Sequence, residues 1–203
     1  MAHQYFEDNT MLSHQCQEWE TVVNETGYRF KTDSGVFSRQ RLDFGTRVLL
    51  ETVIQAEFHP KKILDLGCGY GPVGTVMGTE YPEATLHMVD VSERAMELAR
   101  YNVSANQVAH AKIYSSNIYQ EVKAKDFDLI LTNPPIRAGK EVVHTFISGA
   151  YLHLAMGGRL VLVIQKKQGA PSARKKLLEV FGNVEELERK KGYWILYAQK
   201  NES

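Results

Sequence analysis

The tripeptide Asn133-Pro134-Pro135 is the part of the sequence best suited to chemistry on an amino group. It follows an apolar run, and its two prolines fix the backbone and hold Asn133 extended. The Asn133 side-chain oxygen and the Pro134 carbonyl can accept both N–H bonds of a planar amine, which aims the nitrogen lone pair at an electrophile. Fixed acceptor dipoles of this kind stabilise the positive charge that develops on such an amine. A rigid strand terminator explains the same tripeptide when it is taken alone.

A glycine-rich segment, Asp65-Leu66-Gly67-Cys68-Gly69-Tyr70-Gly71, lies between an apolar run and the helical pattern after it. Glycines allow a sharp turn and a close approach of the backbone to a ligand, and the first turn of a helix adds a partial positive charge. The dinucleotide fingerprint G-x-G-x-x-G is not met, because Pro72 stands where its third glycine belongs. We expect Asp65 to order this loop by accepting N–H bonds. The candidate cofactor-binding residues here are Asp65, Gly67, Cys68, Gly69 and Gly71.

Polar residues also follow the next two predicted strands. Asp90, followed by Val91, closes the run 85–89 and is placed to accept hydrogen bonds from both hydroxyls of a ribose. Asn117 follows the third strand, at the edge where an adenine is expected. A helix-capping acid and an ordinary turn are the alternative interpretations of these two positions.

The elements that must position these residues alternate between strands and helices from Lys61 onward. Near-continuous apolar strands separated by amphipathic helices are typical of a parallel sheet with helices on both faces. A turn at Lys191-Gly192 predicts a closing antiparallel hairpin. The sequence therefore predicts an α/β, Rossmann-like fold with a seven-stranded, mostly parallel sheet. The expected strands are 63–66, 85–89, 112–115, 127–131, 159–164, 183–190 and 193–199, and the expected helices are 71–81, 92–106, 139–156 and 171–181.

The first part of the chain has a different pattern. β-prone runs at 20–24 and 28–32 flank Glu25-Thr26-Gly27, which is a hairpin signal. Asp43-Phe44-Gly45-Thr46 then opens an apolar-periodic stretch, 48–58, that predicts a helix. We expect residues 1–42 to form a small N-terminal β extension and residues 43–203 to form the main domain.

The composition is that of an ordinary soluble protein. Of the 203 residues, 43% are hydrophobic and 24% are charged, which is enough for a buried core. The chain has no apolar run long enough to cross a membrane and no signal-peptide pattern, so we expect a cytoplasmic protein without a membrane partner. Cys16 and Cys68 form no metal-binding pattern, so we expect no metal.

Charge is distributed unevenly, although the net charge is zero. Residues 1–30 carry five acids and one base, whereas residues 159–200 carry ten bases and four acids. This asymmetry suits a basic face for phosphates, and solvated helix and strand faces explain any single cluster equally well. The candidate phosphate-binding residues are Lys166, Lys167, Arg174, Lys175, Lys176, Arg189, Lys190 and Lys191.

The segment 65–71 resembles the first motif of class I methyltransferases. Asn133-Pro134-Pro135, which comes later in the chain, resembles the motif of amino-group N-methyltransferases. The resemblance implies S-adenosyl-L-methionine as the cofactor, with Asp65 near its methionine end and Asn133 beside its sulfonium. It implies that the catalytic residues are Asn133, Pro134, Pro135 and Ile136.

Ile136 departs from that motif, because the residue after the second proline is usually an aromatic that stacks on the target base. Another residue must then supply the packing, or the target differs. The candidate substitutes are Phe37, Phe44 and Tyr101.

The segment 33–46 is similar to the one that precedes the catalytic fold in ribosomal RNA small subunit methyltransferase C and its relatives. With the motifs above, the resemblance covers roughly residues 28–200. It implies transfer to guanine N2 of 16S ribosomal RNA, with RNA or a small-subunit particle as the partner. It also implies that Phe37, Arg41 and Asp43 are pocket or lid residues, for which a buried aromatic and a surface ion pair are the alternative.

Several other functions are compatible with parts of the sequence. A glutamine N-methyltransferase of release factors shares the chemistry, but it normally has an aromatic after N-P-P and a helical N-terminal domain. DNA adenine methylation is disfavoured because no target-recognition insertion is present, and an NAD-dependent oxidoreductase is disfavoured by Pro72. A non-catalytic partner protein that binds S-adenosylmethionine stays an open alternative, as does the oligomeric state.

Overall fold

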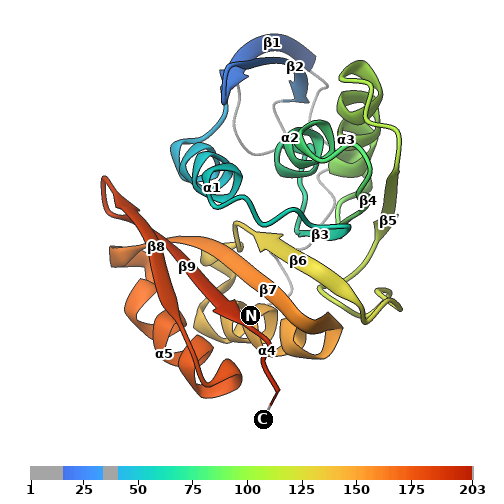
Figure 1. The fold of residues 1–203 in the computed structure, drawn as a ribbon. Coiled ribbons are helices and arrows are strands. Elements are labelled where there is room, and N and C mark those ends of the chain that lie inside the picture. The colour runs from blue at the N-terminus through green and yellow to red at the C-terminus, as the bar shows by residue number, and fades with distance from the viewer. Residues whose placement is uncertain (1–15, 34–40, 203) are drawn as a thin grey trace.

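The computed structural model describes residues 16–33 and 41–202, and its centre is a seven-stranded sheet in the order β5-β4-β3-β6-β7-β9-β8 (Figure 1). Strands β3 to β7 pair in parallel, and β9 runs antiparallel to both β7 and β8. The predicted Rossmann-like fold, with a mostly parallel sheet and a final antiparallel hairpin, is confirmed. The strands are β3 (Lys62–Leu66), β4 (Thr85–Asp90), β5 (Ala111–Ser115), β6 (Phe127–Thr132), β7 (Leu154–Gln165), β8 (Glu185–Lys190) and β9 (Tyr193–Gln199).

Helices cover both faces of the sheet, because its central strands are apolar on both sides. Three helices lie on one face, α1 (Phe44–Gln55), α2 (Pro72–Glu80) and α3 (Glu93–Ala105), and two on the other, α4 (Lys140–His153) and α5 (Ala170–Phe181) (Figure 1). Each face has its own buried apolar cluster. None of the helices in the described ranges is long and apolar enough to cross a membrane.

A two-stranded antiparallel hairpin, β1 (Cys16–Val23) and β2 (Thr26–Asp33), lies outside the main sheet. Its turn is Asn24-Glu25, one residue earlier than predicted, and Thr26 and Gly27 belong to β2. Both turn residues have positive φ, 46° and 65°, as a two-residue type I′ turn requires. The glycine at position 27 suggested a later turn, but the strands pair in the register that buries apolar side chains of the hairpin.

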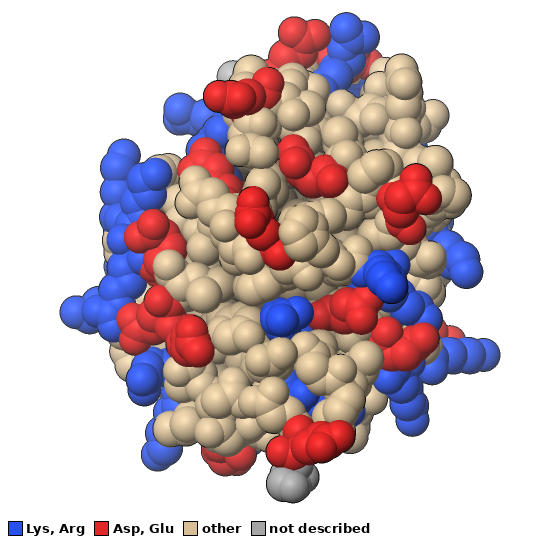
Figure 2. Space-filling view, in the orientation of Figure 1, with Lys and Arg blue, Asp and Glu red and all other residues tan. Residues whose placement is uncertain are grey.

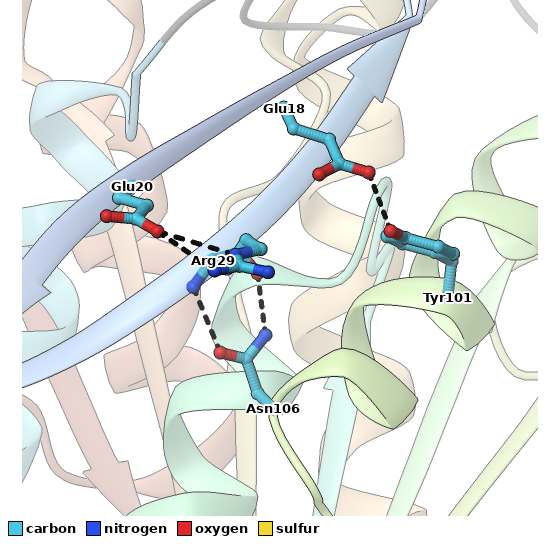
Figure 3. A network of polar contacts seen from close by, with 5 residues as sticks. All are labelled: Glu18, Glu20, Arg29, Tyr101 and Asn106. Atoms are coloured by element: carbon cyan, nitrogen blue, oxygen red, sulfur yellow. Dashed lines mark hydrogen bonds and ion pairs between the residues drawn. The ribbon is translucent and has the colours of Figure 1, made fainter.

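The hairpin packs on α3 through polar contacts as well as apolar ones (Figure 3). The Asn106 side chain accepts from the Arg29 backbone N–H at 3.0 Å and donates to the Arg29 carbonyl at 2.7 Å. The Tyr101 hydroxyl donates to Glu18 Oε1 at 2.6 Å. The side chains of Tyr28 and Phe30 are buried in the same apolar cluster as α1 and α2. The hairpin therefore shares its core with the main fold.

Some element boundaries differ from those predicted. Helix α1 begins at Phe44, with Asp43 as its N-cap, and ends at Gln55 rather than at residue 58. Helix α4 ends at His153, and β7 begins at Leu154 instead of residue 159. The extra residues belong to β7 because Leu154 pairs with β6, and the backbone groups of Gly157 and Gly158 bond to Lys200. A Gly-Gly pair that looked like a helix stop is thus part of an irregular strand.

A buried ion pair joins the end of β2 to the first turn of α3. Two guanidinium nitrogens of Arg94 donate to Asp33 Oδ2 at 2.8 and 2.5 Å, and the two side chains are 8% and 2% exposed. Burial of two charges is costly, and it is tolerated only where the geometry of the pair is good. This contact holds the hairpin against the same helix whose N-cap, Ser92, follows Asp90.

We predict that Arg94→Met lowers the free energy of unfolding by about 3–5 kcal/mol, because it leaves the buried Asp33 carboxylate without its guanidinium donors. The double variant Asp33→Leu/Arg94→Met removes both charges and should regain most of that loss. Urea denaturation of the three proteins measures the effect. Equal destabilisation by the single and the double change would show that the charge pair does not cause it.

Candidate active site

Strand β3 lies between β4 and β6. The chain adds β4 and β5 on one side of β3 and then adds β6 and the later strands on the other side. Leu64 pairs in parallel with His87 of β4 on one side and with Ile130 of β6 on the other. The glycine-rich loop after β3 and Asn133 after β6 therefore meet at the carboxyl edge of the sheet, where open α/β sheets bind ligands.

A cavity of about 420 Å³ opens at this edge. Its volume is within the range of small-molecule sites. The sequence-predicted residues that line it are Asp65, Gly67, Cys68, Gly69, Asp90, Val91, Asn133, Pro134 and Pro135.

The glycine-rich loop is held from the end of β4. Gly67 and Cys68 both donate their backbone N–H groups to the Val89 carbonyl at 2.9 Å. One Asp90 oxygen accepts from the Gly69 N–H at 2.8 Å, and the other accepts from the Ser92 N–H at 3.0 Å. A carboxylate oxygen has more than one lone pair, so Asp90 can hold the loop and still accept from a ligand.

Asp65 is buried below the loop. Its Oδ2 accepts from the Gly74 N–H, inside α2, at 2.8 Å. Burial raises its pKa to about 7, the Gly74 hydrogen bond lowers the pKa, and the nearby Asp90 charge raises it. The contact with Gly74 agrees with the expected role of ordering the turn between strand and helix. It also leaves a titratable group at the cavity that changes charge near neutral pH.

Asn133 is fixed by its side-chain amide as well as by the prolines. Its Nδ2 donates to Thr46 Oγ1 at 3.1 Å, and Thr46 is a buried residue of α1 that also lines the cavity. Thr46 is held in turn, because its backbone N–H is capped by Asp43 Oδ1 at 3.1 Å. One amide N–H is therefore engaged by Thr46, and the carboxamide oxygen, for which no hydrogen bond from a described residue is found, is left as the acceptor.

Tyr193, the first residue of β9, supplies an aromatic ring to the cavity wall. It packs against Phe44 of α1, with ring centroids 5.7 Å apart. Gly45 makes this possible, because a Cβ at that position would lie 2.7 Å from the Tyr193 ring. Neighbouring residues of α1 thus place both the Asn133 amide and the Tyr193 ring.

Other predicted site residues lie elsewhere. Gly71 does not line the cavity; it is the N-cap of α2 with φ +89°, and a Cβ there would lie 3.1 Å from the Ala99 backbone. Asn117 is exposed, and its neighbours Ser116 and Ile118 line the cavity instead. Ile136 begins the 3₁₀ helix η2 (Ile136–Ala138), and its side chain lies outside the part of the chain that is described.

The residues suggested as pocket residues or as aromatic substitutes lie in different places. Asp43 lines the cavity, whereas Arg41 and Tyr101 do not, and Phe37 lies outside the described residues. Tyr101 lies on α3, where its hydroxyl bonds to Glu18 on the hairpin. Phe44 contributes only through its contact with Tyr193.

Sequence reasoning missed part of the wall. Gln165 ends β7 and Gln168 follows it at the carboxyl edge, and that position was a usable signal. Thr46 and Tyr193 had no local signal, because they reach the cavity only through helix packing and through the antiparallel pairing of Gln165 with Tyr193.

The cavity fits the cofactor that was predicted. It offers acidic groups at two strand ends, a loop of glycines that exposes backbone, and an apolar wall that includes Phe146 and Ile164. No group of three or more His, Cys, Asp or Glu side chains within 16–33 and 41–202 is arranged to hold a metal ion. The fold and the site define the class of Rossmann-like methyltransferases that use S-adenosylmethionine.

Comparison with known families identifies the group within that class. The model of the methyltransferase small domain matches residues 27–197, so the chain belongs to the methyltransferase small domain family. The predictions of a methyltransferase and of S-adenosylmethionine as its cofactor are therefore confirmed.

Two relatives give the degree of similarity. The uncharacterized protein YbxB of Bacillus subtilis (strain 168) is 43% identical over 201 residues, which cover 98% of this chain and 100% of that protein. Ribosomal RNA small subunit methyltransferase C of Salmonella choleraesuis (strain SC-B67) is 38% identical over 152 residues, which cover 72% of this chain and 43% of that enzyme. The chain thus matches less than half the length of the latter relative.

Solved structures are similar in fold. The T. thermophilus 16S rRNA N2 methyltransferase, in complex with AdoMet and guanosine, has a TM-score of 0.83 at 24% identity, over 94% of this chain and 52% of that one. The ribosomal protein L11 methylase of Lactobacillus delbrueckii subsp. bulgaricus has a TM-score of 0.67 at 20% identity, over 78% of this chain and 79% of that one.

The raised pKa of Asp65, about 7, predicts a pH dependence of ligand binding. Below that pH the carboxyl is protonated in the ligand-free protein, and a cationic amino group beside it favours the carboxylate. The affinity for S-adenosylhomocysteine, whose methionine amino group is expected near Asp65, should therefore rise with pH up to about 7 and then level off, with proton release at lower pH. Calorimetry in buffers of different ionisation enthalpy measures both effects.

Asp65→Asn is the matched control, because an amide oxygen can still accept from Gly74. Its affinity should change little between about pH 5.5 and 7.5. The same pH profile in the variant and in the wild type would assign the titration to another group.

Proposed function

We propose that this methyltransferase transfers the methyl group of S-adenosylmethionine to the N2 amino group of guanine in small-subunit (16S) ribosomal RNA. The observation that carries the proposal is the contact of Asn133, whose amide nitrogen donates to Thr46 in the wall of the cavity that the glycine-rich loop also lines. The relatives named for 16S rRNA methylation support the choice of substrate.

When bound, the cofactor supplies an electrophilic methyl group on a sulfonium. In our proposal Asp90 accepts from its ribose hydroxyls, and the backbone of Gly67 to Gly69 lies along its methionine part. Ser116 and Ile118 replace Asn117 as the residues beside the adenine. Asp65 supports the loop and offers negative charge to the amino group.

The chain's own part in the reaction is to orient a weak nucleophile. The Asn133 oxygen and the Pro134 carbonyl accept from the two N–H bonds of the guanine amino group, which directs the nitrogen lone pair at the methyl carbon. The amino nitrogen would take the methyl group of the bound cofactor, and the electron pair of the former C–S bond would stay on sulfur. The amino group then loses one proton to solvent, so no strong base is needed. Alignment and fixed dipoles supply the rate enhancement.

Tyr193 takes the role of the aromatic residue that position 136 lacks. Its ring lies in the cavity wall and is supported from behind by Phe44. Stacking of a base on an aromatic side chain stabilises a complex by about 1–3 kcal/mol. We therefore assign Tyr193, rather than Tyr101, as the residue that packs on the target guanine.

We predict that Asn133→Ala lowers the rate of single-turnover methyl transfer by about 10²- to 10³-fold, because one preorganised polar partner is lost. Affinity for S-adenosylhomocysteine and thermal stability should stay near those of the wild type. Thr46→Val, which keeps the shape but removes the partner of the Asn133 amide, should cause a smaller loss. Normal turnover in a stable Asn133→Ala protein would remove this mechanism.

A second variant series tests the stacking role. Tyr193→Phe should keep the KM for RNA, and Tyr193→Ala should raise it by roughly 5- to 100-fold, which corresponds to the loss of one stacked base. Steady-state methylation of transcribed 16S rRNA fragments measures this. A role for the hydroxyl instead of the ring would appear as an equal defect in the Phe variant.

A release-factor glutamine is the alternative acceptor, since it has the same planar amino group. Incubation with immature small-subunit particles, free 16S rRNA and a release factor, followed by nucleoside and peptide analysis, separates the two substrates. No transfer to any of them, despite cofactor binding, would favour a non-catalytic partner protein.

A further inference from the structure

Four lysines project from the two segments that form one wall of the cavity. Lys166 and Lys167 belong to the 3₁₀ helix η3 (Lys166–Gln168), which directly follows Gln165 and includes Gln168. Lys190 ends β8 and Lys191 begins the turn to β9, so that only Gly192 separates them from Tyr193. The Lys166 N–H donates to the Gly192 carbonyl at 2.8 Å, so the helix and the turn are adjacent.

The basic residues of the C-terminal region are not equivalent. Arg174 and Arg189 both pair with Glu186, and Lys176 pairs with Glu179 at 2.7 Å. Lys166, Lys167 and Lys191 are exposed and form no ion pair with any described residue, and Lys190 has only a 4.0 Å contact with Glu51. Lys175 also has no ion pair with a described residue, but it lies on α5 and does not line the cavity. The four lysines beside the cavity therefore carry positive charge that no close carboxylate of a described residue compensates.

Lys191 is also held in place. It has positive φ, 49°, and its ammonium lies 5.0 Å from the centre of the Phe44 ring, which supports Tyr193. A cation–π contact positions an ammonium without neutralising its charge. The positive charge of Lys191 is thus fixed next to the aromatic wall of the site.

Charge is distributed unevenly over the rest of the surface as well. Figure 2 shows Lys and Arg side chains gathered along the side where the β8–β9 hairpin lies in Figure 1. The β1–β2 hairpin carries Glu18, Glu20 and Glu25 on another part of the molecule. A polyanion is attracted to the first region.

We propose that Lys166, Lys167, Lys190 and Lys191, here called the lysine rim, bind the phosphates of the RNA strand next to the target guanine. The proposal rests on the proposed function, because it takes the strand that enters this cavity to be RNA. Lysines act as point charges toward phosphate, so the rim adds affinity without reading sequence. Base recognition stays with Asn133 and Tyr193.

The test uses two paired variants of the full chain, Lys166→Ala/Lys167→Ala and Lys190→Ala/Lys191→Ala. Lys112→Ala/Lys123→Ala is the matched control, because both lysines are exposed, do not line the cavity and lie on β5 and on the loop before β6. Binding of a fluorescent, guanine-containing single-stranded fragment of 16S rRNA is measured over a range of salt concentrations. Methyl transfer to that fragment and affinity for S-adenosylhomocysteine are measured beside it.

Each rim variant should weaken RNA binding roughly tenfold at low salt and reduce the slope of log K against log salt by about 1.4, since each single-strand phosphate contributes about 0.7. The control should retain the wild-type slope, and cofactor affinity should be unchanged in all variants. RNA that is bound and methylated normally by both rim variants would overturn the rim and leave the proposed function intact. Wild-type protein that neither binds nor methylates RNA, but methylates a release factor, would overturn both.

Discussion

The parallel pairing of β3 with both β4 and β6 is the constraint on which the site depends. Because three neighbouring strands end at the same edge, the glycine-rich loop, Asp90 and Asn133 are brought together from separate parts of the chain. The loop itself uses left-handed backbone at Gly67 and Gly69, with φ of 74° and 55°, which glycine adopts readily. The apolar clusters on both faces of the sheet hold that edge rigid, so precision at the cavity is a consequence of packing far from it.

The edge also concentrates negative charge. Asp65 and Asp90 lie close enough to influence each other. Asp65 accepts from the backbone N–H of Gly74, and Asp90 accepts from those of Gly69 and Ser92. The arrangement is costly without a ligand, since one carboxyl is fully buried. A cationic cofactor relieves this cost. Electrostatics therefore favour a positively charged ligand at the glycine loop, while the lysine rim that we propose favours a negatively charged one at the mouth.

The parts of the site that could be predicted from the sequence are those that a short segment encodes. Asn133-Pro134-Pro135, the loop 65–71 and Asp90 all stand directly after apolar strands, so their place at one edge followed from periodicity alone. Tyr193 and Thr46 were not accessible in this way, because one depends on the register between β7 and β9 and the other on how α1 packs. Gly71 carried the right motif signal but serves the close approach of α2 to α3, which a spacing pattern does not distinguish from ligand contact.

The division into a β extension (1–42) and a main domain (43–203) stays a prediction. The contacts of Asn102 show how the hairpin and the main fold are connected. This fully buried α3 side chain accepts from the Lys31 N–H at 2.6 Å, and its amide donates to the carbonyls of Lys31 and Tyr70 at 2.9 and 2.8 Å. One amide thus connects β2 to the glycine-rich loop. Loss of the hairpin would leave Asn102 with unsatisfied polar groups directly behind the cofactor loop, so the hairpin contributes to the shape of the site without touching it.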